Sequence, residues 1–326
     1  MSKFILLCGL PASGKSKISE QLAVKYNAKV FSSDEIRKEL TGTYEDQSKN
    51  GKVFDILHKR IKDALIAGEN VIYDATNINK KRRIHMINQE FVADEFICYY
   101  MVTPVLNCIV RDLMREKSVG DSIINRMYKD LQVPFYDEGW NHIEYMYASN
   151  VSEGSEASRE IFLQNIKAKA GSHDELFEYL SDVSEHFANI FNMPQDSKYH
   201  SFSVSRHTFE VFNYVNKNFP EDDLILASLF HDIGKFATKS FFNYNGVEKK
   251  YASFIGHENV SAQLSMIIMR RLGFDMSQIY RVARLVQYHM MPLNASEKVN
   301  KRLRTWLNKS EYEQLMNLHE ADQAGH

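Results

Sequence analysis

The apolar residues in the first half of the chain gather in short runs separated by longer amphipathic stretches. FILLCG at residues 4–9 is continuously apolar, which is typical of a parallel strand buried on both faces. Further strand candidates lie at 29–33, 70–75 and 95–103. After the first run, apolar residues recur at i, i+4 and i+8, which gives one apolar helix face: Ile18, Leu22 and Tyr26. Alternating strands and helices predict an α/β domain with a parallel sheet.

The second half has a different pattern. From Asp174 onward the apolar residues recur at helical spacing, which predicts an all-α domain. The exception is SFFNYNGVEKKYASF at residues 240–254. There the dipeptide Asn245-Gly246 lies between alternating aromatic flanks, so we expect a small β-hairpin.

The stretch VSEGSEASRE at 151–160 is small, polar and charged, and it separates the two patterns. A weakly patterned helix runs from Glu160 to Lys169, followed by a second break at Gly171-Ser172. The sequence therefore predicts two domains joined by a linker, with these bounds: 1–152, linker 153–172, and 173–326.

Composition narrows the class of protein. The 326 residues carry a formal net charge of −2, so no global positive field attracts nucleic acid. Contact with nucleic acid would therefore need a local binding groove. Such a groove suits the end of a strand better than a long duplex as the substrate. The three cysteines form no C-x-x-C pair, and no apolar segment is long enough to span a membrane. We expect a reduced, cytoplasmic protein without a membrane partner.

The segment GLPASGKS at residues 9–16 matches G-x-x-x-x-G-K-[ST] between a strand and a helix. Glycines let the backbone approach phosphate oxygens, and successive N–H groups bind the anion. Lys15 is expected to reach the β- and γ-phosphates, and the Ser16 hydroxyl to bind Mg²⁺. The sequence thus predicts ATP and Mg²⁺ as cofactors, bound by the loop residues Gly9, Pro11, Ala12, Ser13, Gly14, Lys15 and Ser16.

Charged residues follow the later strands. Asp34 and Arg37 lie at i and i+3 in a first helical turn, where a carboxylate can accept a hydroxyl proton and a guanidinium can hold an anion. Arg111 and Arg115 lie at i and i+4, and arginines on a lid stabilise charge in phosphoryl transfer. The dense basic run KKRR at 80–83 has a simpler explanation as a solvated helix start.

Together these motifs resemble the P-loop 5′-hydroxyl polynucleotide kinase family over about residues 1–150. The likeness rests on G-x-x-x-x-G-K-S, SSDEIR, YDATN with KKRR, R-x-x-x-R with R-M-Y, and P-F-Y-D-E-G-W. It implies that Asp34 is the general base toward the 5′-hydroxyl and that Arg37 contacts the acceptor phosphate. Arg115, and with a weaker match Arg111, would contact the ATP phosphates. Related small-molecule kinases share this architecture, so a nucleoside or small-molecule acceptor remains the alternative.

Only three of the 12 histidines precede residue 151, so the chemistry changes along the chain. His231-Asp232 follows the apolar LASLF, and Gly-Lys comes next. Burying such groups unpaired would be costly, so a metal or a strong hydrogen-bond partner is expected. Mixed histidine and carboxylate ligands suit Mn, Fe, Co, Ni or Zn. The candidate ligands are His207, His231, Asp232, His257, His289 and Asp322.

This order, H…HD-x-G-K…H…H…D, resembles the HD-domain metal-dependent phosphohydrolase superfamily over about residues 173–326. It is similar to the HD module attached to some bacterial tRNA nucleotidyltransferases. The resemblance implies core ligands, ligands for a second metal in binuclear members, and a bridging aspartate in the HD pair. It also implies that Lys235, and more weakly His200, contact substrate. By that likeness the core ligands are His207, His231, Asp232 and Asp322, and the second-metal ligands are His257 and His289.

Joined in one chain, the two halves predict a bifunctional enzyme that heals nucleic-acid ends. One half would phosphorylate 5′-OH ends of RNA or DNA, and the other would remove a 2′,3′-cyclic or 2′/3′ phosphate before a ligase acts. Similar bifunctional enzymes carry the HD module first, whereas here it is second. Two alternatives stay open: a small-molecule kinase fused to an HD nucleotidase, and a kinase with a regulatory or RNA-binding HD module. RNA or DNA preference, metal identity and oligomeric state are not encoded in these motifs.

Overall fold

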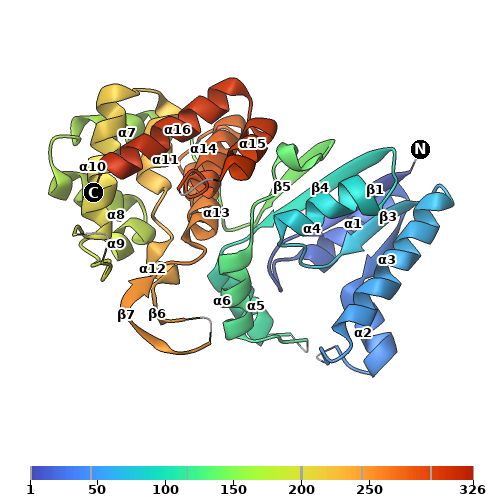
Figure 1. Ribbon diagram of the computed structural model, residues 1–326. Helices are drawn as coiled ribbons and strands as arrows, with labels where there is room; N and C mark the ends of the chain where they lie inside the picture. Colours follow the sequence, from blue (N-terminus) through green and yellow to red (C-terminus); the bar gives the residue numbers. More distant parts are fainter. Residues whose placement is uncertain are drawn as a thin grey trace. The chain divides into compact units, whose positions relative to one another are not determined.

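The computed structural model describes residues 2–44, 46–115, 117–198, 201–243, 245–293 and 296–325. The chain divides into two compact units, 1–150 and 151–326 (Figure 1). No helix in the described ranges is both long enough and apolar enough to cross a membrane. The three cysteines are buried and free, so none forms a disulfide.

The first unit is a five-stranded parallel sheet in the order β2-β3-β1-β4-β5, with helices between the strands (Figure 1). This confirms the predicted α/β class. The strands are β1 (Lys3–Cys8), β2 (Ala28–Ser32), β3 (Asn70–Asp74), β4 (Glu95–Val102) and β5 (His142–Tyr147). The helices are α1 (Lys15–Tyr26), α2 (Ser33–Thr41), α3 (Asn50–Ile66), α4 (Lys80–His85), η1 (Met86–Glu90), α5 (Val105–Leu113), α6 (Asp121–Asp130) and η2 (Tyr136–Glu138).

The expected apolar face of α1 packs on one side of this sheet. Leu22 is buried among strand side chains, and Ile18 and Tyr26 pack against the same cluster. On β1, Ile5 and Leu7 belong to this cluster. Because side chains alternate along a strand, the β1 side chains between Ile5 and Leu7 and on either side of them point to the opposite face of the sheet. The continuous apolar run of β1 is thus explained by burial on both faces.

The basic run at 80–83 divides between solvent and core, which corrects its interpretation as a solvated helix start. Arg83 is completely buried and forms a two-pronged ion pair with Glu138, at 2.7 Å from Nε to Oε2 and 2.6 Å from Nη2 to Oε1. The Trp140 indole N–H also donates to Glu138 Oε2 at 3.0 Å. Lys80 is buried and pairs with Asp137. Through these buried ion pairs, Lys80 and Arg83 hold the PFYDEGW segment in place.

Glu138→Gln is expected to destabilise the first unit strongly, because it leaves the Arg83 cation buried without an anion. Loss of one partner of a buried ion pair costs about 3–5 kcal/mol. Trp140 emission during urea unfolding, in a Trp306→Phe background, reports this unit alone, since the chain has two tryptophans. The exposed pair of His142 with Glu144 provides a control in Glu144→Gln. A midpoint shift no larger than the control's would contradict the prediction.

The second unit is helical, with one antiparallel hairpin between β6 (Ser240–Phe242) and β7 (Glu248–Ser253), as predicted. Its helices are α7 (Glu156–Ala168), α8 (His173–Val183), α9 (Glu185–Ile190), α10 (Val204–Asn218), α11 (Asp222–Phe230), α12 (Lys235–Thr238), α13 (His257–Arg271), α14 (Met276–Tyr288), α15 (Glu297–Trp306) and α16 (Lys309–Ala324). Every residue of α11 from Leu224 to Phe230 is buried, so this helix forms the centre of the unit.

Residues 153–172, which the sequence suggested as a linker, lie within the second unit. Ser155 caps α7, with its side chain accepting from the Ser158 N–H, and the helix buries Phe162 and Ile166. The serines and glutamates of this stretch therefore begin a helix and do not form an open connection.

Candidate active sites

The glycine-rich loop connects the carboxyl end of β1 to the start of α1, as the sequence predicted. Gly9 N–H donates to Thr76 O at 3.0 Å. Its φ of +153° is unfavourable for other residues, and an added Cβ would lie 2.9 Å from Met101 Cβ. Glycine is therefore required at this position. Pro11, Ala12, Ser13 and Gly14 complete the loop before α1 begins at Lys15.

Lys15 and Ser16 lie at the position expected for contacts with phosphate and Mg²⁺. Lys15 is buried, and its ammonium donates to Leu10 O at 2.7 Å and Gly9 O at 3.1 Å. Burial lowers the pKa of Lys15, while the negative charge of Asp74 acts in the opposite direction. The Ser16 hydroxyl donates to Asp74 Oδ2 at 3.2 Å. A hydroxyl beside a carboxylate is the oxygen pair that holds Mg²⁺ in P-loop enzymes.

Asp74 was not among the predicted site residues. It ends β3, which pairs with β1 so that Leu7 and Asp74 are neighbours in register. Burial raises the pKa of Asp74, and Lys15 lowers it. The sequence signal was present, because D-A-T-N follows an apolar run, but its use required knowing that β3 lies beside β1.

Asp34 and Arg37 lie on the next strand connection, at the same sheet edge. Ser32 at the end of β2 pairs in register with Asp74, and Asp34 follows in the first turn of α2. Arg37 Nη1 donates to Asp34 Oδ1 at 2.7 Å, and Nη2 donates to Asn50 Oδ1 at 3.0 Å. Arg37 is buried, whereas the Asp34 side chain is 52% exposed. The carboxylate is thus oriented and still accessible to a substrate.

The two lid arginines do not share a helix face, which corrects the i, i+4 interpretation. Helix α5 ends at Leu113, with Arg111 exposed in its last turn. Asp112 then accepts hydrogen bonds from the N–H groups of Val119 and Gly120, both at 2.9 Å, and this turns the chain back. Arg115 lies in that turn and is held by Asp112, with Nε 2.7 Å from Oδ1.

Lys117 in the same turn reaches α2. Its ammonium lies 3.6 Å from the ring centre of Tyr44 and donates to Glu35 Oε1 at 3.1 Å. The segment between α5 and α6 therefore contacts the element that carries Asp34. Neither Lys117 nor Tyr44 has a motif in the sequence that would have marked it.

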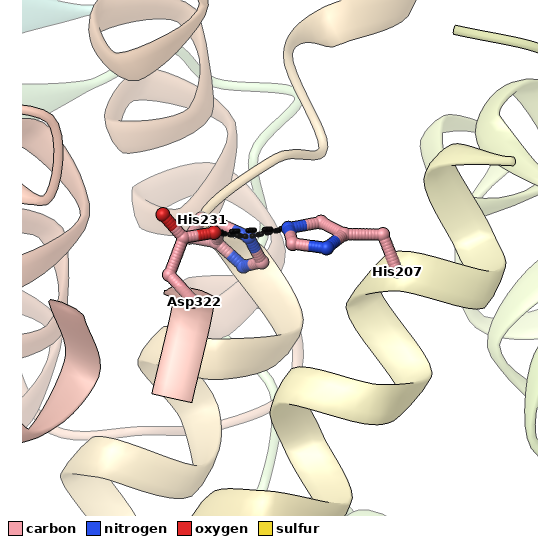
Figure 2. A group of neighbouring side chains, drawn as sticks. All are labelled: His207, His231 and Asp322. Atoms are coloured by element: carbon pink, nitrogen blue, oxygen red, sulfur yellow. Dashed lines mark hydrogen bonds and ion pairs between the residues drawn. The ribbon is translucent and has the colours of Figure 1, made fainter. Parts of the chain in front are cut away.

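The second unit brings all six predicted ligands together at helix ends. Figure 2 shows His207 of α10 facing His231 and Asp322, with His207 Nε2 2.9 Å from Asp322 Oδ1. Two groups have all ligand atoms within 4.8 Å of one another: His207, His231 and Asp322, and Asp232, His257 and His289. Five of these side chains are buried and Asp322 is nearly so.

The hydrogen bonds of the four histidines indicate a cation. Each Nδ1 lies 2.7–3.0 Å from a backbone carbonyl, which can only accept, so Nδ1 carries the proton and Nε2 presents a lone pair. Yet the Nε2 atoms of His207 and His231 are 3.3 Å apart, as are those of His257 and His289. Facing lone pairs repel unless a cation lies near both. Histidine and carboxylate ligands of this kind suit a divalent transition metal. Histidines that bind a metal commonly donate their other ring N–H to a backbone carbonyl, as all four do here.

Asp232 faces both ligand groups. Its Oδ1 is 3.3 Å from His257 Nε2, and its Oδ2 is 3.4 Å from His231 Nε2. Burial raises the pKa of Asp232, but Lys235 and His231 outweigh it and hold the pKa well below the usual value. Burial lowers the pKa of His231, but the carboxylates of Asp232 and Asp322 raise it above its ordinary value. The two carboxylates thus favour positive charge at this point, which a metal can supply instead of a proton.

The pKa of His289 is shifted in the opposite direction to that of His231. Burial and the neighbouring His257 lower the pKa of its imidazole to about 3. It is therefore neutral at physiological pH, as a metal ligand must be.

Lys235 extends from α12 toward the same carboxylate. Its ammonium is 2.6 Å from Asp232 Oδ2 and donates to Gln195 Oε1 at 2.9 Å. Such a buried ammonium can hold an anionic substrate group beside the ligands. His200, the weaker substrate-contact candidate, lies outside the described residues.

Gly234 explains the glycine of the H-D-x-G-K motif. Its N–H donates to Ser261 Oγ of α13 at 2.9 Å. A Cβ there would lie 2.6 Å from His257 O and 2.7 Å from Ser261 N. Only glycine lets the His231-Asp232 segment approach the helix that begins with His257.

Comparison with protein families finds the same two parts. Residues 4–134 match a family described as an AAA domain, and residues 198–321 match the HD domain. The first unit is thus a P-loop kinase-like α/β domain. The second is a helical HD domain with a small hairpin. A kinase-like domain implies ATP with Mg²⁺ and an HD domain implies a divalent metal, for which the second unit offers the two ligand groups described above.

Two curated proteins are similar to parts of the chain. One is the A-adding tRNA nucleotidyltransferase of Deinococcus radiodurans, 32% identical over 106 residues, which are 32% of this chain and 24% of that protein. Another is the L-seryl-tRNA(Sec) kinase of Methanococcus maripaludis, 26% identical over 143 residues, which are 42% of this chain and 55% of that protein. The chain therefore spans about a quarter and about half of these relatives.

Proposed function

We propose that the protein heals RNA ends: it phosphorylates a 5′-hydroxyl in the first unit and removes a 2′,3′-cyclic or 2′/3′ phosphate in the second. The observation that carries this proposal is that one chain holds a G-x-x-x-x-G-K-S loop in its first unit and a cluster of six possible metal ligands in its second. The names of both relatives refer to tRNA, which favours RNA over DNA. A ligase is the class of enzyme that consumes such ends.

In the kinase reaction, Asp34 takes the proton of the 5′-hydroxyl as its oxygen bonds to the γ-phosphorus of ATP and ADP leaves. Arg37 orients this carboxylate at 2.7 Å and offers its guanidinium to the acceptor's first phosphate. Lys15 supplies positive charge to the β- and γ-phosphates, and Arg115 adds to it from the lid. Ser16 and Asp74 would hold Mg²⁺, which would neutralise charge on the phosphates when bound.

In the hydrolase reaction, the four histidines and two aspartates would hold a metal, which when bound would supply activation of water and polarisation of a phosphoryl oxygen. Lys235 places its ammonium at the same carboxylate and neutralises the terminal phosphate of the substrate. The carbonyl acceptors on each Nδ1 keep all four Nε2 atoms directed at the ligand centre.

The size of the acceptor tests the kinase assignment against the small-molecule alternative. Transfer from γ-labelled ATP to a 5′-OH RNA oligonucleotide should be at least about a hundredfold more efficient in kcat/KM than transfer to a free nucleoside, because Arg37 then has a phosphate to bind. Arg37→Ala should lower activity on the oligonucleotide far more than on the nucleoside. Arg60→Ala, which removes an exposed arginine paired with Glu39, is the control. Equal efficiency on both acceptors would contradict the assignment.

A further inference from the structure

The β6–β7 hairpin lies in sequence between two segments that contribute to the candidate metal centre. It begins after α12, which carries Lys235, and ends just before His257, the first residue of α13. Phe254 lies between hairpin and ligand: its carbonyl accepts from His257 Nδ1 at 2.8 Å, and its ring centre is 5.4 Å from the Lys235 ammonium. Whatever the hairpin binds is therefore held at the rim of the site.

The hairpin is also fixed to the loop that orients Lys235. Ala252 N–H donates to Asp196 O at 3.0 Å, and the Lys239 ammonium pairs with the Asp196 carboxylate at 2.6 Å. The neighbouring residue Gln195 accepts from Lys235. Two strands alone would be only marginally stable, so these bonds give the hairpin a defined position.

The exposed side chains of the hairpin are mainly aromatic, apolar or positively charged, with the carboxylate of Glu248 among them. Phe242 is 55% exposed, Tyr251 41% and Ile255 77%. Lys249 is half-buried and its ammonium donates to Ser253 Oγ at 3.3 Å, whereas Lys250 is exposed with its ammonium 5.3 Å from the ring centre of Tyr251. The protein as a whole has a formal net charge of −2, so the aromatic rings and lysines of the hairpin are a local combination.

We propose that this hairpin is a platform for the single-stranded 3′ segment of an RNA whose terminal phosphate enters the metal centre. The inference rests on the proposed function and adds how the second unit selects a polynucleotide. Exposed rings offer stacking to unpaired bases, and lysines beside them offer charge to the connecting phosphates. A duplex would keep its bases stacked inside and leave the rings unused.

The test measures hydrolysis of a terminal phosphate on a short single-stranded RNA and, in parallel, on a 2′,3′-cyclic mononucleotide. In Tyr251→Ala, in Phe242→Ala and in the double variant Lys249→Ala/Lys250→Ala, KM for the RNA should rise about tenfold or more, the size expected for a lost stacking or phosphate contact. The kcat for RNA and both constants for the mononucleotide should stay unchanged. Tyr251→Phe should keep the low KM, because it keeps the ring.

Controls come from the same unit. Lys298→Ala/Lys301→Ala removes two exposed lysines from α15, and Ile161→Ala removes an exposed apolar side chain from α7. Unchanged KM in the hairpin variants, or a parallel loss on the mononucleotide, would overturn the platform. Wild-type protein that leaves the RNA terminus intact would instead overturn the proposed function, so the two failures are distinguishable.

Discussion

Lys15→Ala is expected to abolish phosphoryl transfer while hydrolysis of a terminal phosphate continues at the wild-type rate. The Lys15 ammonium lies within the glycine-rich loop, where it donates to Gly9 O and Leu10 O. Removal of such a preorganised charge should lower kcat for the kinase reaction about 10³-fold. The hydrolase residues belong to the other unit and keep all their contacts.

Lys17→Ala is the matched control, because Lys17 is an exposed lysine on the same helix two residues later. It should retain full kinase activity. Parallel loss of both activities in Lys15→Ala, with the protein still folded, would show that the two reactions share one site.

Asp232→Asn is expected to have the converse effect: hydrolysis falls more than about a hundredfold and kinase activity is unaffected. The substitution keeps the shape of the side chain but removes the negative charge that faces His231, His257 and Lys235. The ratio of bound transition metal to protein, measured by elemental analysis after gel filtration, should fall with it.

Asp182→Asn controls for loss of charge, since Asp182 is an exposed aspartate on α8. Its metal content and hydrolysis should match the wild type. Full metal content and full hydrolysis in Asp232→Asn would exclude the proposed ligand set.

Local sequence patterns located most of the fold. The runs predicted as strands became β1 to β4: β1, β3 and β4 are mostly buried apolar runs, whereas β2 is a mixed sequence that is partly exposed. Strand β5 was missed. Its exposed His142 and Glu144 lie on one face and the buried Ile143 on the other, so the apolar run is interrupted, and the alternation is too short to predict a strand. The small polar residues after it indicated a linker but began α7.

Some site residues could be predicted from local motifs, whereas others could be found only from the folded structure. Residue types and spacing indicated the loop, Asp34 with Arg37, and the six possible ligands, because each stands in a recognisable motif. Asp74 depended on strand order, which motifs do not contain. The proton position on each histidine depends on a backbone carbonyl: the Nδ1 atoms of His231, His257 and His289 each contact the carbonyl three residues upstream, whereas that of His207 contacts Gly325 O. That last contact spans 118 residues of sequence and needs the folded unit.

The measurement that tests the central claim most directly uses one RNA oligonucleotide with a 5′-hydroxyl and a 2′,3′-cyclic phosphate. It is incubated with the purified full chain, ATP, Mg²⁺ and each of Mn, Fe, Co, Ni and Zn, and both ends are determined by mass spectrometry. The account predicts that the 5′ end gains a phosphate and that the cyclic phosphate is opened or removed in the same sample. An oligonucleotide unchanged at both ends, with ATP intact, would contradict it.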